Sequence, residues 1–207
     1  SDFFSYKNFK KLNLKKKADV ITALAVFYDI NDPNKFLSDI KKCLDDNGIF
    51  IIEQSNLAHM IRLNSFDTIC HEHLGYYSTS VIKKLLEKNK FKIFDHEYNK
   101  SNGGSSRYYI THKENKTNFI NKKNINKALD YEKKFKLDKI DTYNAFKANC
   151  EKSREDLVAL LNKLKNEGKR VVGYAATSKS TTVTNYCGIG PDLIEFISDT
   201  TPIKQGK

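Results

Sequence analysis

Apolar and polar positions in the first third of the chain predict a strand, a helix and a second strand. Residues 18–26 form a nearly continuous apolar run of strand length, and residues 49–53 form another. Between them, apolar side chains recur at helical spacing after Pro33, which suits the first turn of a helix, with Asp32 as its cap. Residues 45–48 are typical of a helix stop. Such a unit implies a parallel sheet, whose ligands bind beyond the carboxyl ends of the strands.

The remaining pattern predicts a mixed sheet and a second strand–helix–strand unit. The expected elements are a short helix at 56–63, an amphipathic helix at 79–88 capped by Ser78, an antiparallel strand pair at 91–98 and 105–112, two helical stretches within 125–165, and a strand, helix and strand at 170–174, 181–186 and 193–197. We therefore predict an α/β fold: a domain at 1–114 with a mixed sheet that ends in an antiparallel pair, a linker with helices at 115–168, and the start of a second α/β domain at 169–207.

Composition narrows the class of protein. The chain has 207 residues and a net charge of +11, but its lysines are spread along the sequence, which argues against a nucleic-acid surface. No apolar run approaches the roughly 20 residues of a membrane span. The four cysteines are far apart, which disfavours a disulfide framework and suits a reducing cytoplasm. Because the chain opens at Ser1 and ends directly after a strand-like run, we expect a fragment of a longer protein.

Residues 65–78 contain the closest grouping of side chains that can take part in acid/base chemistry. Two histidines (His71 and His73), Glu72, Cys70 and a pair of tyrosines lie close together between apolar neighbours, about a dozen residues after a strand end. A neutral imidazole accepts a proton near neutral pH without large tuning of its pKa, and a neighbouring carboxylate can orient it. The segment therefore predicts an enzyme active site that performs acid/base chemistry, with His73 as the base.

Two other interpretations of the histidines stay open. The pair can be purely structural, with its imidazoles packed and hydrogen-bonded inside the protein. It can also bind a metal, because a His-x-His spacing on a strand puts both rings on one face, with Cys70 or His59 as further ligands. The sequence has no second pair at metal-ligand spacing, so we predict no metal here.

Outside this segment, several groups suit an anionic or sugar ligand. Gly103 and Gly104 allow positive φ or the close approach of a ligand, and Arg107 could hold a diphosphate with its planar fork, although an exposed strand arginine has the same signature. Lys179, beside the hydroxyls of residues 178–182, resembles a phosphate cradle without the glycine spacing of a Walker motif.

Six runs of residues fall in the order of the sugar C-methyltransferase family, which this chain resembles over nearly its whole length. They are Phe-Tyr-Asp at 27–29, Glu-Gln-Ser at 53–55, His-Glu-His-Leu at 71–74 with the paired tyrosines, Asn-Gly-Gly-Ser at 102–105, Val-Gly-Tyr-Ala-Ala-Thr at 172–177 and Asn-Tyr-Cys-Gly-Ile-Gly-Pro-Asp at 185–192. The last run and the His-Glu-His segment are specific in combination. The resemblance implies class I S-adenosylmethionine-dependent enzymes that act on nucleotide-linked keto-deoxysugars.

The family implies three parts: an N-terminal zinc-binding domain, a Rossmann-like methyltransferase domain and a C-terminal Rossmann-like domain. By this resemblance the chain holds the back of the second part and the start of the third. The zinc domain, the glycine-rich loop and the acidic ribose-binding residue are then expected outside it. We accordingly expect S-adenosylmethionine as the cofactor of the whole protein, zinc only in that first domain, a nucleotide sugar as substrate, and little activity from this fragment by itself.

The resemblance also assigns roles. The family's adjacent glutamate and histidine match Glu72 and His73. The further candidates are His71 and Tyr76 for catalysis, Asp2, Phe3, Ala23 and Ala25 for the cofactor, and Tyr77, Asn102, Gly103, Gly104, Arg107 and Lys179 for the substrate. Two positions depart from the family pattern: Cys70 stands where a tyrosine assists, and Asp29 where a second histidine lies. Both departures bear on the substrate, the methylated carbon and the identity of the base.

Two functions from other classes compete with this one. A nucleotide-cofactor oxidoreductase uses a similar sheet, and the fingerprint that would separate the two lies in the expected missing portion. A non-catalytic nucleotide-sugar-binding module is the other, in which the sugar pocket persists without the cofactor site.

Overall fold

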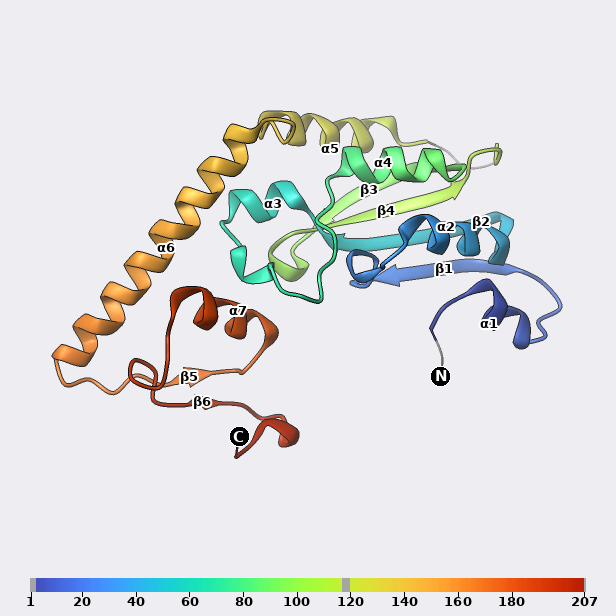
Figure 1. The fold of residues 1–207 in the computed structure, drawn as a ribbon. Helices are drawn as coiled ribbons and strands as arrows, with labels where there is room; N and C mark the ends of the chain where they lie inside the picture. The colour runs from blue at the N-terminus through green and yellow to red at the C-terminus, as the bar shows by residue number, and fades with distance from the viewer. Residues whose placement is uncertain (1–2, 117–119, 207) are drawn as a thin grey trace. The chain divides into compact units, whose positions relative to one another are not determined.

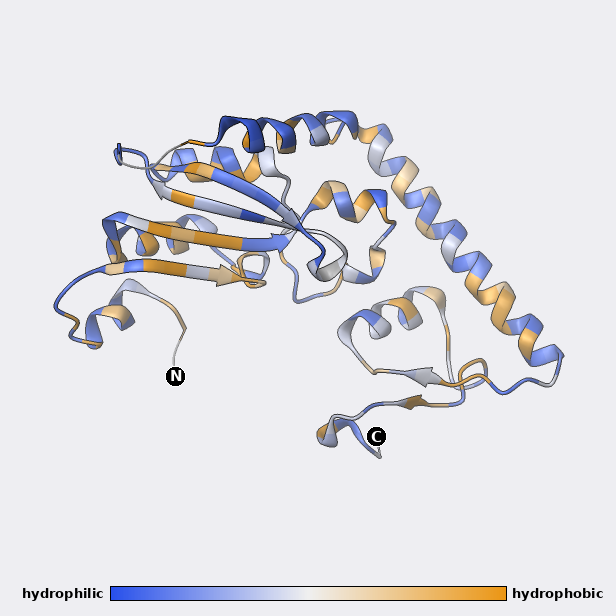
Figure 2. Ribbon diagram, turned by 180° about the vertical axis from the view of Figure 1, so that it is seen from behind, coloured by the Kyte–Doolittle hydropathy of each residue, from blue (hydrophilic) through white to orange (hydrophobic). Residues whose placement is uncertain are grey.

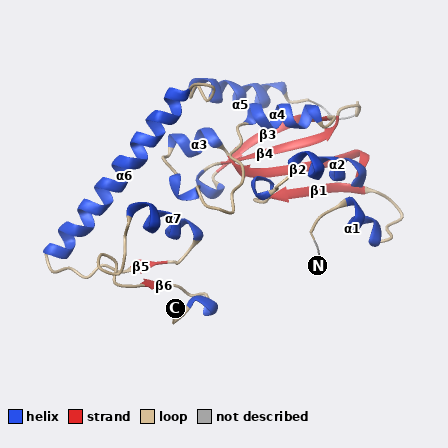
Figure 3. Ribbon diagram, in the orientation of Figure 1, coloured by secondary structure: helices blue, strands red, loops and turns tan. Residues whose placement is uncertain are grey.

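The computed structural model describes residues 3–116 and 120–206, which group into two compact units. The first unit combines Ser1–Leu63 with Leu74–Asp138, and the second combines Asn64–His73 with Lys139–Lys207. Figures 1 and 3 show the elements of both units. The helices are α1 (Tyr6–Lys11), α2 (Pro33–Cys43), α3 (Leu57–Arg62), α4 (Thr79–Lys88), α5 (Lys122–Lys134), α6 (Ile140–Asn166) and α7 (Ser178–Cys187), and the strands are β1 (Ala18–Leu24), β2 (Leu44–Ser55), β3 (Phe91–Asn99), β4 (Ser105–His112), β5 (Gly173–Tyr174) and β6 (Ile197–Ser198).

The first unit is built on a four-stranded mixed sheet in the order β1-β2-β4-β3. β1 runs parallel to β2, whereas β4 is antiparallel to both β2 and β3. This arrangement confirms the predicted α/β fold with a mixed sheet. Because β3 runs in the same direction as β2, the strands β1, β2 and β3 end at one edge of the sheet, near Leu24, Ser55 and Asn99. We call this edge the carboxyl edge.

One face of the sheet carries the core, and α2, α4 and α5 contribute to it. Phe50 and Ile52 of β2 face the same side as their partners Ile110 and Tyr108 of β4, and all four side chains are fully buried. Figure 2 shows apolar residues concentrated in the middle of β1 and β2. Each such side chain contributes about 2 kcal/mol by leaving water, whereas an exposed ion pair contributes at most about 1 kcal/mol. Apolar burial on this face therefore stabilises the first unit far more than its surface lysine–aspartate pairs.

Local capping explains where the helices begin. The Asp32 side chain accepts a hydrogen bond from the Lys35 N–H at 2.9 Å and starts α2 just before Pro33, as predicted. Ser78 accepts from the Val81 N–H at 3.3 Å and starts α4. These caps confirm the two helix starts that the sequence predicted.

The structure corrects two predictions about the first strands. β1 was expected to be buried, but only Ala23 is, while Val20 and Leu24 are more than half exposed. Within residues 3–116 and 120–206, no strand pairs with the outer edge of β1, so that edge stays open. In addition, β2 begins at Leu44 and includes residues 45–48, which were predicted only to end the preceding helix. The pairing of β1 with β2 is irregular there: β1 advances from Ala18 to Val20 while its partner advances from Leu44 to Ile49.

The second unit contains the long helix α6 and a small β5–α7–β6 motif. β5 and β6 pair in parallel, which confirms the predicted strand–helix–strand unit, although both strands are shorter than predicted. The Asn64–His73 segment packs within this unit. Phe66 lies 5.2 Å from the Tyr186 ring of α7, and Asn64 donates from its Nδ2 to the Asn149 carbonyl of α6 at 3.3 Å.

A buried histidine in β3 makes the stability of the fold depend on pH. His96 is only 3% exposed and lies between the rings of Tyr98 and Tyr108. Burial lowers the pKa of His96 to about 4, against about 6.5 in an unfolded chain. Between these two pH values the unfolded chain binds more protons, so stability is fully present above about pH 6.5 and falls as the pH drops towards 4.

We therefore expect His96 to account for a loss of about 3 kcal/mol of unfolding free energy between pH 7 and pH 4. Urea denaturation at both pH values, in the natural chain and in His96→Phe, measures this contribution. The variant should lose less stability than the natural chain over the interval. Identical losses would show that His96 does not titrate on unfolding.

Candidate active site

Residues 74–77 are fixed at the carboxyl edge of the first unit. The N–H groups of Leu74 and Gly75 both donate to the Tyr28 carbonyl, at 2.9 and 3.1 Å, just after the end of β1. The Tyr77 carbonyl accepts from the Leu57 N–H at 3.1 Å, where α3 begins. The segment that follows the His-Glu-His motif is thus tied to the two places where ligands bind in such sheets.

Tyr77 is half-buried and packs against the core, with its ring 5.6 Å from that of Phe27. Burial raises the pKa of Tyr77, so its hydroxyl stays a hydrogen-bond donor at neutral pH. Gly75 is required beside it, because a Cβ there would lie 2.8 Å from the Tyr77 ring. Tyr76 is also half-buried.

The three residues predicted for proton transfer lie in the second unit. His71 and Glu72 are exposed and His73 is half-buried, so none of them is enclosed in a packed interior. The Ser178 hydroxyl, at the start of α7, donates to Glu72 Oε2 at 3.3 Å. Next to it, Lys179 Nζ lies 3.8 Å from Asp67 Oδ2. The first turn of α7 therefore holds the segment that carries Glu72, and that turn contains the predicted substrate residue Lys179.

The predicted substrate residues after β3 are engaged with the protein itself. Gly103 and Gly104 have φ values of +78° and +121°, as their sequence predicted, and Asn102 lies beside them in a 3₁₀ turn. A Cβ at Gly104 would lie 3.0 Å from the His59 ring, so a glycine at this position leaves room for that ring. The Arg107 guanidinium pairs with Glu53 at 2.6 Å and with Glu97 at 2.7 Å. These two carboxylates offset the positive charge of Arg107, which leaves little of it for a diphosphate.

The predicted cofactor residues lie at or near the carboxyl end of β1, apart from Asp2, which is outside the described residues. Ala23 is buried, whereas Ala25 is exposed with a φ of +53° and donates its N–H to the Glu53 carbonyl at 2.8 Å. Phe3 is 92% exposed. Phe3 lines a hollow formed with residues of α1, and neither Ala23 nor Ala25 belongs to its lining.

Sequence reasoning missed one residue at this edge. Gln54 is 1% exposed, and within the described part of the chain neither its Oε1 nor its Nε2 has a hydrogen-bond partner. An unpaired amide of this kind is costly, and in native proteins it often marks a functional position. The signal was available in the sequence, since Phe50, Ile52 and Gln54 share the inward period-two register of one strand.

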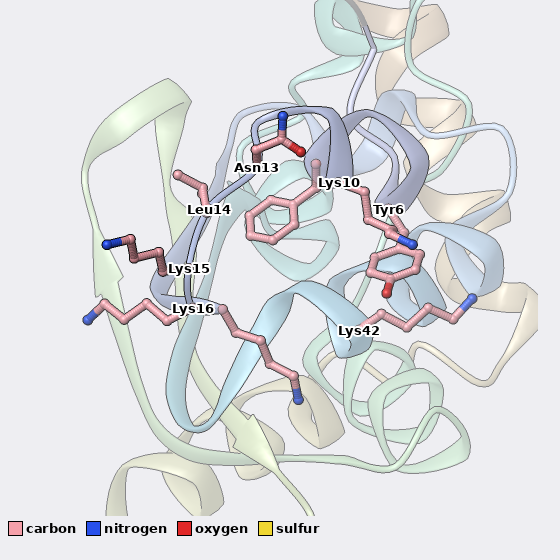
Figure 4. Close-up of a pocket in the computed structure, with 9 residues that line it drawn as sticks. Tyr6, Lys10, Asn13, Leu14, Lys15, Lys16 and Lys42 are labelled. Atoms are coloured by element: carbon pink, nitrogen blue, oxygen red, sulfur yellow. The ribbon is translucent and has the colours of Figure 1, made fainter.

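A different hollow lies at the opposite, amino-terminal edge of the sheet. This hollow has a volume of about 500 Å³. In Figure 4 the Tyr6 ring and Lys10 of α1 lie on one side of it beside Lys42, and residues of the loop before β1 line the other side. The ammonium groups of Lys10 and Lys42 lie 6.0 and 5.5 Å from the centre of that ring. Its position away from the strand ends separates it from the candidate active site. Among the described residues, no group of three or more potential metal ligands occurs, and no helix has the length and apolar content to cross a membrane.

Two family models match this chain. Residues 100–207, just over half of the chain, match the C-methyltransferase C-terminal domain, and residues 2–96 match a methyltransferase domain. The fold and the matched domains thus define a methyltransferase class. The chain belongs to the C-methyltransferase family, which confirms the resemblance that the sequence motifs indicated.

Three individual proteins that are similar to this chain are at most 29% identical to it, and the chain covers only part of each. The C-methyltransferase NovU of Streptomyces niveus is 29% identical over 181 residues, which make up 87% of this chain and 43% of that protein. The chain therefore spans less than half of this curated relative. Among solved structures, the magnesium protoporphyrin IX methyltransferase ChlM of Synechocystis PCC 6803 with bound SAH has a TM-score of 0.36 at 14% identity, covering 48% of this chain and 47% of that one. An S-adenosylmethionine-dependent methyltransferase of Clostridium acetobutylicum has a TM-score of 0.38 at 16% identity, covering 50% and 62%.

Proposed function

We propose that the protein is an S-adenosylmethionine-dependent C-methyltransferase that acts on a nucleotide-activated keto-deoxysugar. The observation that carries this proposal is how the His-Glu-His segment is held and how far its side chains are exposed to solvent. Glu72 is held by Ser178, His73 stays accessible, and Leu74, the next residue in the chain, is hydrogen-bonded at the end of β1. Membership of the C-methyltransferase family supports the reaction class, and the family resemblance supports the sugar substrate.

The proposed chemistry assigns a proton-transfer role to this segment. The neutral imidazole of His73 removes a proton from a carbon next to the substrate ketone, which leaves a nucleophilic enolate carbon. The Glu72 carboxylate orients the imidazole or relays the proton that it takes up. The Tyr76 hydroxyl donates a hydrogen bond to the oxygen on which charge develops. S-adenosylmethionine, when bound, supplies the electrophilic methyl group.

The residues that would hold this cofactor lie on the first unit. The candidates are Ala25, which is exposed at the end of β1, the backbone at Ala23, and the exposed ring of Phe3. On the substrate side, the Tyr77 hydroxyl and the glycine turn at 103–104 are the first candidates. Lys179, the residue after Ser178, is a further candidate on the substrate side, and its ammonium lies 3.8 Å from Asp67 Oδ2.

Isothermal titration of the full-length protein tests the cofactor class. We expect S-adenosylhomocysteine to bind with micromolar affinity and NAD⁺ to give no heat of binding, because the family uses an adenosyl sulfonium donor. The two competing functions predict other results. Binding of NAD⁺ alone would indicate an oxidoreductase, and binding of nucleotide sugars without either cofactor would indicate a non-catalytic module.

A further inference from the structure

A second hollow at the carboxyl edge of the first unit has no role in the chemistry above. It has a volume of about 730 Å³, within the range of small-molecule sites, and lies between α3, α5 and the end of β3. Its lining combines aromatic rings with a row of lysines from α5. We infer that this hollow binds a nucleoside diphosphate, and we name it the ring–lysine pocket.

The aromatic part of the pocket is a packed set of three rings. His59 of α3 lies 4.8 Å from the Tyr98 ring and 5.0 Å from the Tyr131 ring, and the two tyrosines are 5.7 Å apart. Each ring comes from a different element, so the fold fixes their mutual arrangement. Flat aromatic surfaces of this kind bind nucleobases by stacking and tolerate different bases.

The position of His59 depends on the glycine turn. Gly104, in a conformation that favours glycine, leaves room for the His59 ring, where any Cβ would lie 3.0 Å away. Burial lowers the pKa of His59, and the ring therefore stays neutral at pH 7 and acts as a stacking surface. The sequence predicted that Gly103 and Gly104 contact the ligand. In the structure this turn leaves room for the His59 ring, which forms one wall of the pocket.

The charged part of the pocket suits a diphosphate. Lys123, Lys127 and Lys134 all line it from α5. Within the described residues, none of these three lysines forms a salt bridge, whereas the acidic residue of the lining, Asp130, pairs with Lys133 at 3.3 Å. Three uncompensated ammonium groups attract an anion of two or more charges. A ring surface with an adjacent positive row therefore matches a base joined to a diphosphate.

This inference rests on the proposed function, because a nucleotide-activated sugar carries this group. It also places the nucleotide recognition on α3, β3 and α5. The lysine-lined hollow around Tyr6 is the competing location for an anion, but it lies at the opposite edge of the sheet.

Residues 1–207 contain no tryptophan, which allows a direct test on a chain of these residues. In Tyr131→Trp the single indole reports on the ring–lysine pocket, and in Tyr6→Trp it reports on the other hollow. We expect UDP to quench the fluorescence of Tyr131→Trp saturably and pyrophosphate to leave it unchanged, because the base stacks on the ring. Quenching confined to Tyr6→Trp, or linear quenching in both variants, would overturn the inference.

Lysine variants test the charged half without altering the core. In isothermal titration, Lys127→Gln combined with Lys134→Gln should weaken UDP binding about tenfold or more, since each lysine supplies charge to the phosphates. Lys122→Gln, on the same helix but outside the pocket, is the matched control and should bind like the natural protein. Equal affinity in all three proteins would rule out the pocket, and this measurement holds even where Tyr131→Trp fails to fold.

Failure of the pocket and failure of the proposed function give different results. If methyl transfer proceeds while the lysine variants bind UDP normally, the pocket is wrong and the function stands. If UDP binds as expected but no methyl group is transferred to any nucleotide sugar, the function is wrong and the pocket stands.

Discussion

Replacing His73 with asparagine is expected to lower the rate of methyl transfer by about 10²- to 10⁴-fold, the usual contribution of a positioned base. Asparagine keeps a similar size and polarity but cannot take up a proton. Because the loss falls on a chemical step, kcat should drop far more than KM changes. Transfer of a labelled methyl group by the full-length protein measures the effect, with a thermal melt to confirm that the fold is retained.

Two neighbouring variants distinguish a base from a merely structural histidine. Glu72→Gln should reduce kcat with little change in KM, because the carboxylate that orients the imidazole or relays its proton is lost. Ser178→Ala should have a smaller effect in the same direction, and Ser178→Thr should restore most of the activity, since the hydroxyl that donates to Glu72 returns. An exposed lysine of α4, replaced in Lys84→Gln, serves as the control. Unchanged turnover in His73→Asn would remove the assignment.

The second large effect is expected on stability, from Glu132 in α5. Its carboxylate is 4% exposed and accepts hydrogen bonds from the Thr79 N–H and, at 3.0 Å, from the Ser80 N–H at the start of α4. Asn56, the cap of α3, also donates to it at 3.4 Å. Glu132→Ala should therefore cost about 2–4 kcal/mol, because it leaves buried donors without an acceptor.

Chemical denaturation of Glu132→Ala measures this cost directly. Asp130→Ala, on the exposed side of the same helix, is the matched control and should stay within about 0.5 kcal/mol of the natural chain. Glu132→Gln should fall between the two, since its amide oxygen accepts a hydrogen bond but carries no charge. A loss below about 1 kcal/mol in Glu132→Ala would show that water replaces the missing carboxylate.

Local signals in the sequence predicted most helices and the direction of the sheet. Asp32, Ser78 and Gly168 mark helix ends through side-chain caps or a positive φ, and such signals depend on neighbouring residues alone. The antiparallel pair of β3 and β4 follows from two apolar runs joined by a glycine turn. These features could be predicted from the sequence because they depend on residues that are neighbours in the chain.

Features that depend on distant partners could not be predicted. Apolar residues 18–26 suggested a buried strand, and only the sheet order revealed that β1 lies at an edge. Likewise, nothing near Glu72 in the sequence indicates Ser178, which lies 106 residues further along. Gln54 is an intermediate case, since its inward register was readable but its unpaired amide was not.

The open side of β1 bears on how the isolated chain will behave in solution. A row of backbone donors and acceptors, flanked by the exposed side chains of Val20 and Leu24, is a template onto which a strand of another molecule can add. Concentrated samples of residues 1–207 should therefore tend towards intermolecular pairing along this strand. A lysine introduced at position 20 would oppose such pairing without touching the core.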